Sequence, residues 1–205
     1  MYIWFTVCAL CMFVAAYIHL RSVEHVRLQE KHGVEKGVKI GKIYGTVSGT
    51  MESILLVGLW ISPQPSFTIP RFPDAAVAVV GFTIPLTHLA ISIPLILAGM
   101  WSGVGGVRGV GLEVAETHST PMRLETKGMY SVVRHPQYLG WVLAHLGFSV
   151  LLSAWYSMLF TPVLAGLVYL VSKKEEDELV REFGEEYQIY RKRTPMFIPL
   201  FRKAR

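Results

Sequence analysis

Long runs without a charged residue are the feature that most constrains the fold of this chain. The longest, from Tyr138 to Val171, has 34 residues without Lys, Arg, Asp or Glu. Three more are almost as apolar: Tyr2–Leu20, Ile43–Ile61 and Ala75–Trp101. A helix that crosses a bilayer needs about 20 apolar residues, and about 17 suffice. Together with 52% hydrophobic and 17% charged residues, these runs predict an all-α integral membrane protein rather than a soluble domain.

The 34-residue run is long enough for two short antiparallel helices that join near Ser153, which brings the prediction to five transmembrane helices. Of the 20 Lys and Arg residues, a five-span chain places 19 on one side and only Arg71 on the other. By the positive-inside rule that side is cytoplasmic and carries the C-terminal tail. The net charge of +5 then reflects membrane orientation rather than nucleic-acid binding.

The sequence changes character near residue 102, which suggests two parts. Residues 1–101 form a three-span membrane scaffold, and residues 102–205 form the polar, function-bearing region. The second part begins with Gly103–Gly111, which matches neither G-x-G-x-x-G nor a P-loop, so we interpret it as a flexible connector. Apolar residues at three- and four-residue steps predict an amphipathic helix from Ser172 to Arg193, with Gly184 as a point of close packing or a break.

A short polar segment, Arg134-His135-Pro136-Gln137-Tyr138, stands just before the hairpin. Pro136 disfavours helix at His135 but suits the first helical turn, so His135 is expected at the N-terminus of the next helix. Free backbone N–H groups there favour anionic or polar ligand groups. The alternative is an interfacial anchor, because Arg, His and Tyr are common at membrane boundaries.

A cluster of acids, Glu175 to Glu178, follows the hairpin. On a helix, Glu176 lies beside the apolar face that Leu179, Val180 and Phe183 define. The alternative is a solvated helix face. A buried carboxylate requires a partner, which here is either Arg134 or an amine or hydroxyl group of a ligand. Folding of the hairpin would return this cluster to the Arg-His-Pro segment.

Together the two segments resemble the C-terminal signature of the isoprenylcysteine carboxyl methyltransferase and phospholipid methyltransferase group. The resemblance covers about 80 residues, and before Leu124 only the hydropathy agrees. The matching positions are Gly128, Tyr130, Arg134, His135, Pro136, Tyr138, Gly140, Glu175, Glu176, Leu179, Phe183, Gly184, Glu186, Tyr187, Tyr190, Pro195 and Pro199.

The resemblance implies an integral membrane enzyme that binds S-adenosylmethionine between the hairpin and the tail. The implied cofactor-binding residues are Leu124, Gly128 and Tyr130 on the adenosine side, and His135, Pro136, Tyr138 and Glu176 at the polar groups. Arg134 and Glu176 are the implied catalytic pair, with Arg134 binding the cofactor carboxylate or an anionic acceptor. An Arg that the family often has near its last Pro is absent, so either Arg191 or Arg193 takes that role or the role itself is absent.

Methyl transfer from a sulfonium requires positioning and no metal ion. A carboxylate acceptor needs no base, whereas an amine would need Glu176 or His135 to remove a proton. The implied acceptor is a lipid-embedded, prenylcysteine carboxylate-like group on a small molecule or a protein, with a phospholipid amine as the alternative. Two other classes stay open: an NADPH-dependent reductase related to sterol reductases, and a non-catalytic scaffold. The oligomeric state is not predicted.

One further residue lies inside an apolar run. Glu52 is in the middle of Ile43–Ile61, where an ionised carboxylate is normally paired or faces a cavity. His88 and His145 in other runs are plausible partners. A role in a lipid-substrate cavity and a purely structural hydrogen bond are both compatible with the sequence.

Overall fold

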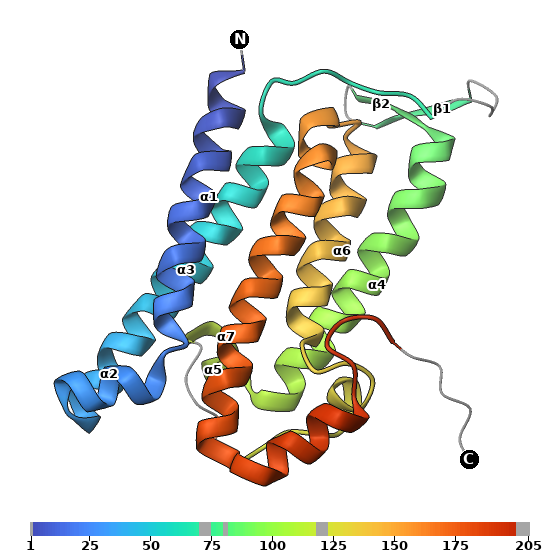
Figure 1. The fold of residues 1–205 in the computed structure, drawn as a ribbon. Helices are drawn as coiled ribbons and strands as arrows, with labels where there is room; N and C mark the ends of the chain where they lie inside the picture. Colours follow the sequence, from blue (N-terminus) through green and yellow to red (C-terminus); the bar gives the residue numbers. More distant parts are fainter. Residues whose placement is uncertain (1, 70–74, 80–81, 118–122, 200–205) are drawn as a thin grey trace, which may run out of the picture.

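Five long helices form an antiparallel bundle in the computed structural model, which describes residues 2–69, 75–79, 82–117 and 123–199 (Figure 1). The long helices are α1 (Ile3–Ser22), α3 (Val34–Ile61), α4 (Leu86–Val110), α6 (Pro136–Leu151) and α7 (Trp155–Arg193). The short elements are α2 (His25–His32), α5 (Leu112–Thr117), the 3-10 turn η1 (Gly128–Ser131) and the strands β1 (Ala76–Val79) and β2 (Phe82–Pro85).

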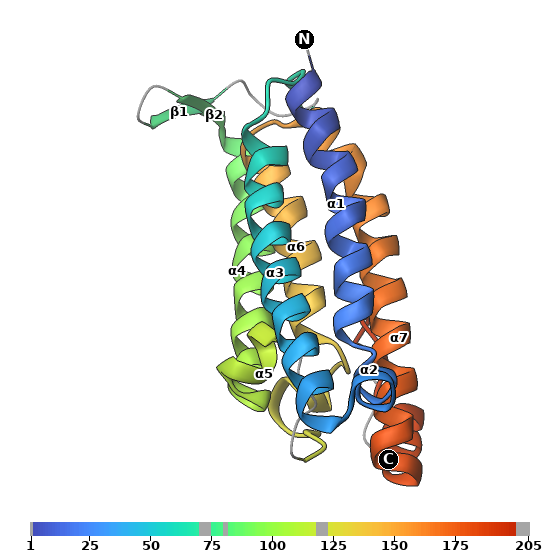
Figure 2. The ribbon, with the colours of Figure 1, turned by 90° about the vertical axis from the view of Figure 1, so that its left-hand side faces the viewer.

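The two ends of the bundle differ in the elements that cover them. The β1–β2 hairpin lies at the same end as the start of α1, while α2, α5 and the last turns of α7 lie at the other end (Figures 1 and 2). That second end also receives the start of α6, because α6 runs back toward the hairpin end. The polar segments singled out in the sequence therefore gather at the end that α2 and α5 cover.

Three helices in the described part of the chain, α1, α4 and α7, are long and apolar enough to cross a membrane. Their outer faces carry large exposed apolar side chains, among them Trp4, Leu97 and Trp101, as expected of surfaces that lie in lipid. The helix α6 has 16 residues, about 24 Å at 1.5 Å per residue, and α3 begins with several lysines. An all-helical membrane bundle is therefore supported, while the count of five spans stays a prediction. Arg71, the one basic residue predicted on the far side, lies outside the described residues.

The hairpin of helices is where the sequence predicts it. The helix α6 ends at Leu151 and α7 begins at Trp155, so the turn includes Ser153, whose φ is +52°. The predicted tail helix is the continuation of α7 rather than a separate element. Its path bends at Gly184, which has φ +55° and ψ −124°, a conformation that glycine adopts at little cost. The predicted break at Gly184 is therefore confirmed.

Two expectations about local structure are wrong. Residues 76–79 and 82–85, predicted as the start of a helical span, form the antiparallel pair β1–β2, which lies at one end of the helical bundle. Valines favour strands, and Pro85 precedes the first residue of α4. Gly103–Gly111, interpreted as a flexible connector, is helical as far as Val110. The predicted boundary between residues 101 and 102 also falls inside α4, and the division into two parts stays a prediction.

Glycines in α4 have a packing role against α6. A Cβ atom on Gly99 would lie 2.8 Å from the Gly140 carbonyl oxygen, and one on Gly106 would lie 2.6 Å from the Gln137 side chain. The helices α4 and α6 can therefore approach closely only because these positions lack side chains. Small residues serve helix packing in membranes in the same way.

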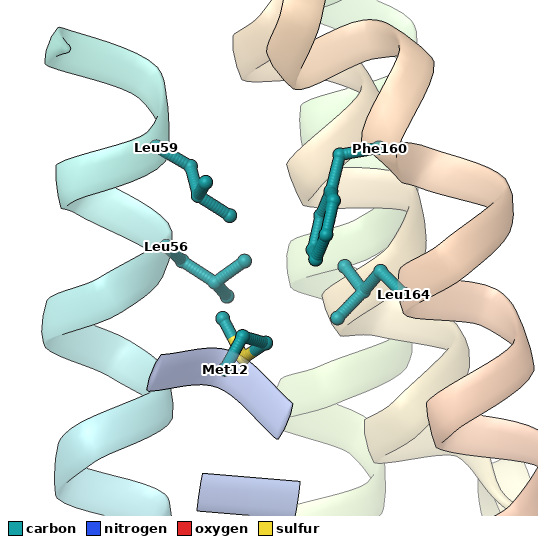
Figure 3. Packing of buried hydrophobic residues seen from close by; sticks show 5 residues of the cluster. All are labelled: Met12, Leu56, Leu59, Phe160 and Leu164. Carbon is teal, nitrogen blue, oxygen red and sulfur yellow. The ribbon is translucent and has the colours of Figure 1, made fainter. Parts of the chain in front are cut away.

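The apolar core lies between α1, α3 and α7, in the half of the bundle nearer the β1–β2 hairpin. Figure 3 shows its five buried side chains: Met12, Leu56, Leu59, Phe160 and Leu164. Met12, with its flexible thioether, fills the space between the facing leucines of α3 and α7. This core fixes α1 and α7 side by side, and both helices then continue toward the polar end.

Candidate functional site

The site begins at the N-terminus of α6, where His135 is the residue that precedes the helix and Pro136 occupies its first turn, as predicted. The backbone N–H of Arg134 donates to the Pro195 carbonyl at 2.9 Å, and that of His135 donates to the Met196 carbonyl at 3.2 Å. These two bonds hold the segment after α7 against the start of α6. The Arg-His-Pro segment is therefore held between α6, which begins at Pro136, and the segment that follows α7.

The two polar segments meet through Glu176. The Arg134 Nε atom donates to the Glu176 Oε1 atom at 2.6 Å, and the His135 Nε2 atom lies 3.2 Å from the same oxygen. The Arg134 Nη1 atom also donates to the carbonyl oxygens of Arg191, at 3.1 Å, and of Thr194. Both charged side chains are buried, so their pairing compensates for the loss of hydration. The predicted convergence of the segments, and of Arg134 with Glu176, is confirmed.

A first cavity of about 90 Å³, measured as space open to the centre of a water molecule, opens beside this cluster. It lies between α2, the end of α4, α5, the start of α6 and the last part of α7. Six of the predicted site residues line it: Leu124, Tyr130, Arg134, His135, Pro136 and Tyr138. Gly128 and Glu176 are not among the described lining residues. Glu176 lies behind Arg134 and His135, while Gly128 begins the η1 turn with φ +58°.

Carboxylates dominate the charge of the first cavity. Glu125, Glu175, Glu178 and Glu182 line it, against one guanidinium, that of Arg134. Glu178 is already occupied, since its Oε2 atom accepts the Val26 backbone N–H at 3.0 Å and its Oε1 atom accepts from Arg181 at 2.9 Å. The cavity therefore presents a net negative surface to a ligand.

Two buried polar atoms of the first cavity have no hydrogen-bond partner among the described residues: Glu175 Oε2 and the Tyr187 hydroxyl. The His135 Nδ1 atom lies 3.6 Å from Glu175 Oε2, beyond hydrogen-bonding distance. Tyr187 is 1% exposed. Because buried polar groups are nearly always satisfied, unpaired atoms beside a cavity mark positions where a ligand group can bind.

Tyrosines and a histidine complete the walls of the first cavity. The Tyr190 hydroxyl donates to the Tyr130 carbonyl at 2.6 Å, and Gln137 Nε2 donates to the Tyr130 hydroxyl at 3.2 Å. Burial raises the pKa of Tyr130, so the phenol stays neutral. Burial also lowers the pKa of His25, despite the opposing charge of Glu175, which favours the neutral imidazole.

A second cavity, of about 50 Å³ on the same measure, continues into the bundle. It shares Ala115, Gln137 and Tyr138 with the first cavity. Its other walls come from α1, α3, α6 and α7, and they are mostly apolar. The exception is its polar end, which His19, Glu52 and Tyr138 form together.

Glu52 is paired, but with a residue that sequence reasoning missed. The His19 Nδ1 atom lies 2.9 Å and 3.1 Å from the two Glu52 oxygens, and His19 Nε2 lies 3.0 Å from the Tyr138 hydroxyl. The expected partners have other contacts: His88 Nδ1 bonds to Ser153 at 2.9 Å, and His145 Nδ1 accepts from Trp60 at 3.0 Å. The expectation that His88 or His145 pairs with Glu52 is therefore wrong. His88 and His145 both lie nearer than Glu52 to the end of the bundle that carries the β1–β2 hairpin.

Sequence reasoning identified the Arg-His-Pro segment and Glu176, but not Glu175, Tyr187, His25 or His19. Glu175 and Tyr187 stand inside the signature, so their identity was available, while their orientation was not. His19 and His25 come from the N-terminal half, where no motif marks them. The side chains of Arg191 and Arg193, candidates for the missing Arg, are exposed and outside the described cavity lining.

The comparisons with known proteins match the C-terminal half of the chain, which carries most of this site. Residues 87–186 match the model of the phospholipid methyltransferase family. The matched segment includes α4, α6, most of α7 and the Arg-His-Pro segment between them. The resemblance predicted from the sequence is therefore confirmed for the part of the chain that builds most of the first cavity.

Individual relatives belong to two kinds of methyltransferase. The chain is 35% identical over 98 residues to a methanethiol S-methyltransferase of Crocosphaera subtropica, which covers 48% of this chain and 38% of that protein. It is 40% identical over 88 residues to a protein-S-isoprenylcysteine O-methyltransferase of Schizosaccharomyces pombe, covering 42% and 37%. The human protein of that name is 33% identical over 99 residues, covering 44% and 31%. The matches thus span less than two fifths of each relative.

Proposed function

We propose that the chain is an S-adenosylmethionine-dependent methyltransferase whose acceptor reaches the site from the bilayer. The observation that carries this proposal is the first cavity, in which six of the residues predicted for the donor site lie around unpaired polar atoms. It lies at the polar end of an apolar bundle. A water-soluble methyl donor can enter there, while a lipid-like acceptor can enter between the helices.

The charge of the first cavity favours this donor over NADPH. S-adenosylmethionine carries a sulfonium and an ammonium group, and both are stabilised by nearby carboxylates such as Glu175 and Glu182. NADPH carries several phosphate charges, which the same carboxylates repel. Arg134 does not offset this, because its guanidinium already bonds to Glu176. The reductase alternative therefore has less support.

The roles we propose follow from position. Glu175 Oε2 and the Tyr187 hydroxyl hold polar groups of the donor, and Leu124, Tyr130 and Tyr138 form walls around it. Arg134 and Glu176 position His135 and the N-terminus of α6 from behind. The donor supplies a methyl group activated by its positive sulfur. The protein contributes orientation, worth several kcal/mol of the barrier in favourable cases.

Three acceptor classes are candidates. The sequence favours a prenylcysteine carboxylate, the acceptor type in the name of the fission yeast relative. The family name points to phospholipids, which supports an amine. The cyanobacterial relative is named for a thiol. The apolar walls of the second cavity suit the hydrocarbon part of any of these.

The proposed membrane arrangement has five spans, α1, α3, α4, α6 and α7, with the C-terminus and the first cavity on the cytoplasmic side. The alternation of helix directions supports it, as does the basic composition of the α1–α3 and α7 ends. Membrane lipids and a lipid or prenylated substrate are the expected partners.

Two measurements test the proposal. The purified chain in lipid nanodiscs should bind S-adenosylmethionine by calorimetry and should not bind NADPH under the same conditions. It should then transfer a labelled methyl group to at least one of three acceptors, namely S-farnesylcysteine, phosphatidylethanolamine or an alkanethiol. Binding of NADPH alone, or of neither compound, would contradict the proposal.

A further inference from the structure

The second cavity has the composition of a binding site for a molecule with an apolar body and one polar atom. Its apolar walls come from both α1 and α7, where they face each other: Met12, Ala16, Leu164, Leu167, Val168 and Val171. Its polar atoms are concentrated at the end next to the first cavity. An apolar ligand in the second cavity would therefore point its polar atom toward the first.

At that junction the side chains of Glu52, His19 and Tyr138 form a chain of hydrogen bonds. With Glu52 ionised, the His19 Nδ1–H donates to the carboxylate, and Nε2 is left to accept the Tyr138 O–H at 3.0 Å. His19 is 4% exposed and Glu52 is 9% exposed. A carboxylate that orients an imidazole, which in turn faces a hydroxyl group, is the general arrangement for removing a proton from that hydroxyl.

We propose that the second cavity binds the methyl acceptor, that Glu52, His19 and Tyr138 take up its proton, and that the acceptor is an apolar thiol. This inference rests on the proposed function and names the acceptor that the function leaves open. Tyr138 is the link, because it lines both cavities and bonds to His19. In the first cavity Tyr138 also interacts with the Glu175 side chain, so it connects the two cavities.

The chemistry of the pair selects among the three acceptors. A carboxylic acid, with a pKa near 4, arrives ionised and needs no base, and its charge is repelled by Glu52. An ammonium group is stabilised by Glu52 in its charged form, which opposes the loss of its proton. A thiol enters an apolar cavity uncharged, and it reacts as a thiolate, so it benefits from a base beside it that takes up its proton.

The proton and electron balance is simple. The thiol S–H proton passes to the Tyr138 oxygen while the Tyr138 hydrogen passes to His19 Nε2, and Glu52 stabilises the resulting imidazolium. The sulfur lone pair forms the new S–CH₃ bond. The bond between the methyl carbon and the sulfonium sulfur of the donor breaks, and its electron pair stays on that sulfur. The products are two neutral thioethers and one proton, which leaves His19 for solvent.

Two titratable side chains contact His19 in the second cavity. Glu52 comes from α3 and Tyr138 from α6, and no other titratable side chain is among the described residues that line the second cavity. On the far side of Tyr138 lie His135, whose ring stacks on it at 5.7 Å, and Glu175. The pH dependence of the transfer therefore reports on the Glu52, His19 and Tyr138 group.

The test compares 1-hexanethiol with S-farnesylcysteine as acceptors for the full chain in nanodiscs, over a range of pH. For the thiol, kcat/KM should reach its plateau well below the pKa of the free thiol. Glu52→Gln should lower kcat/KM at pH 7 by about 100-fold, and the loss should shrink as the pH rises and solution thiolate becomes available. Glu35→Gln, an exposed glutamate of the same helix α3, is the matched control and should have no effect.

A second measurement needs no methyl transfer. Hexanethiol added to the chain without a methyl donor should show the ultraviolet absorbance of a thiolate at neutral pH, and Glu52→Gln should abolish it. If the rate of the unaltered chain rises with pH only in proportion to the thiolate in solution, the inference is overturned. This result does not depend on whether the Glu52→Gln variant folds. So would methylation of S-farnesylcysteine but not of the thiol, which would leave the proposed function standing. Absence of S-adenosylmethionine binding would instead contradict the proposed function itself.

Discussion

The two cavities of this molecule are built in different ways from the sequence. Most walls of the first cavity come from a continuous, motif-rich part of the chain, Leu124–Tyr190, with α2 and the end of α4 as a cover. The second cavity draws on α1, α3 and α6 for its polar end and on α1 and α7 for most of its apolar walls. The first cavity thus has a recognisable signature, whereas the second consists of isolated residues that only the fold brings together.

This difference has a functional meaning under the proposed activity. A methyl donor common to a family requires one set of residues in one geometry, which a signature can preserve. Acceptors differ among the relatives, some named for a thiol and others for an isoprenylcysteine. A cavity formed by scattered residues of the N-terminal helices can change with the acceptor while the donor site stays the same. Substitutions in each cavity should therefore separate donor binding from acceptor selection.

The largest effect is expected from Glu176→Gln. This change leaves the buried guanidinium of Arg134 without its anionic partner and places a neutral amide beside His135 in place of the carboxylate. Loss of one member of a buried ion pair costs about 3 kcal/mol or more, so both the stability and the S-adenosylmethionine affinity should fall steeply. Thermal unfolding in detergent and calorimetric binding measure the two effects. An unchanged donor affinity would show that Glu176 does not position the first cavity.

A smaller effect, confined to donor binding, is expected from Glu175→Gln. Its Oε2 atom is unpaired, so the substitution breaks no hydrogen bond of that oxygen in the described structure. We expect the dissociation constant of S-adenosylmethionine to rise about 10-fold, equivalent to about 1.4 kcal/mol, with little change in thermal stability. Glu185→Gln, an exposed glutamate one turn beyond the cavity residue Glu182, is the matched control. Equal effects of the two substitutions would mean that only the overall charge of α7 matters.

The second cavity can be tested by filling it. Val168→Phe adds an aromatic ring to a wall that α7 contributes, so the KM of a bulky acceptor should rise several-fold while the donor affinity is unchanged. Overpacking of this kind typically costs 1–3 kcal/mol of stability, which thermal unfolding will show. Val163→Phe adds the same ring on an exposed face of the same helix and should alter neither quantity. A change in donor affinity with Val168→Phe would mean that the two cavities are not separate sites.

The two cavities also differ in how much of their structure the sequence predicts. The turn at Ser153, the start of α6 at Pro136, the bend at Gly184 and the meeting of Arg134 with Glu176 follow from local rules of helix geometry and charge pairing. The pairing of His19 with Glu52 does not, because it depends on which faces of α1 and α3 pack together. The helical state of Gly103–Gly111 was missed for a related reason. Glycine is a poor helix former by itself, and close packing of α4 on α6 overrides that preference.

The smallest effect concerns the contacts that hold the N-terminal helices against α7. Glu24 accepts from Arg21 at 2.8 Å, from Lys174 at 3.0 Å and from Arg27 at 3.2 Å. Burial acts to raise the pKa of Glu24, but the hydrogen bond from Lys174 and the three positive charges outweigh it, so its pKa lies below the usual value of 4.5. A carboxyl group with a lowered pKa stabilises the fold above its unfolded pKa, and this contribution is lost as the pH falls through the folded pKa.

Glu24→Gln should therefore lower the melting temperature at pH 7 by roughly 2–4 °C, and the difference from the unaltered chain should disappear as the pH falls below about 4. Glu35→Gln, an exposed glutamate at the start of α3, should change the melting temperature at neither pH. Because Lys174 precedes Glu175 by one residue on α7, the substitution should also raise the dissociation constant of the donor slightly, by less than Glu175→Gln does. A larger effect on the acceptor than on the donor would mean that α1 and α2 serve the second cavity alone, and that the separation of the two regions is sharper than their shared residues indicate.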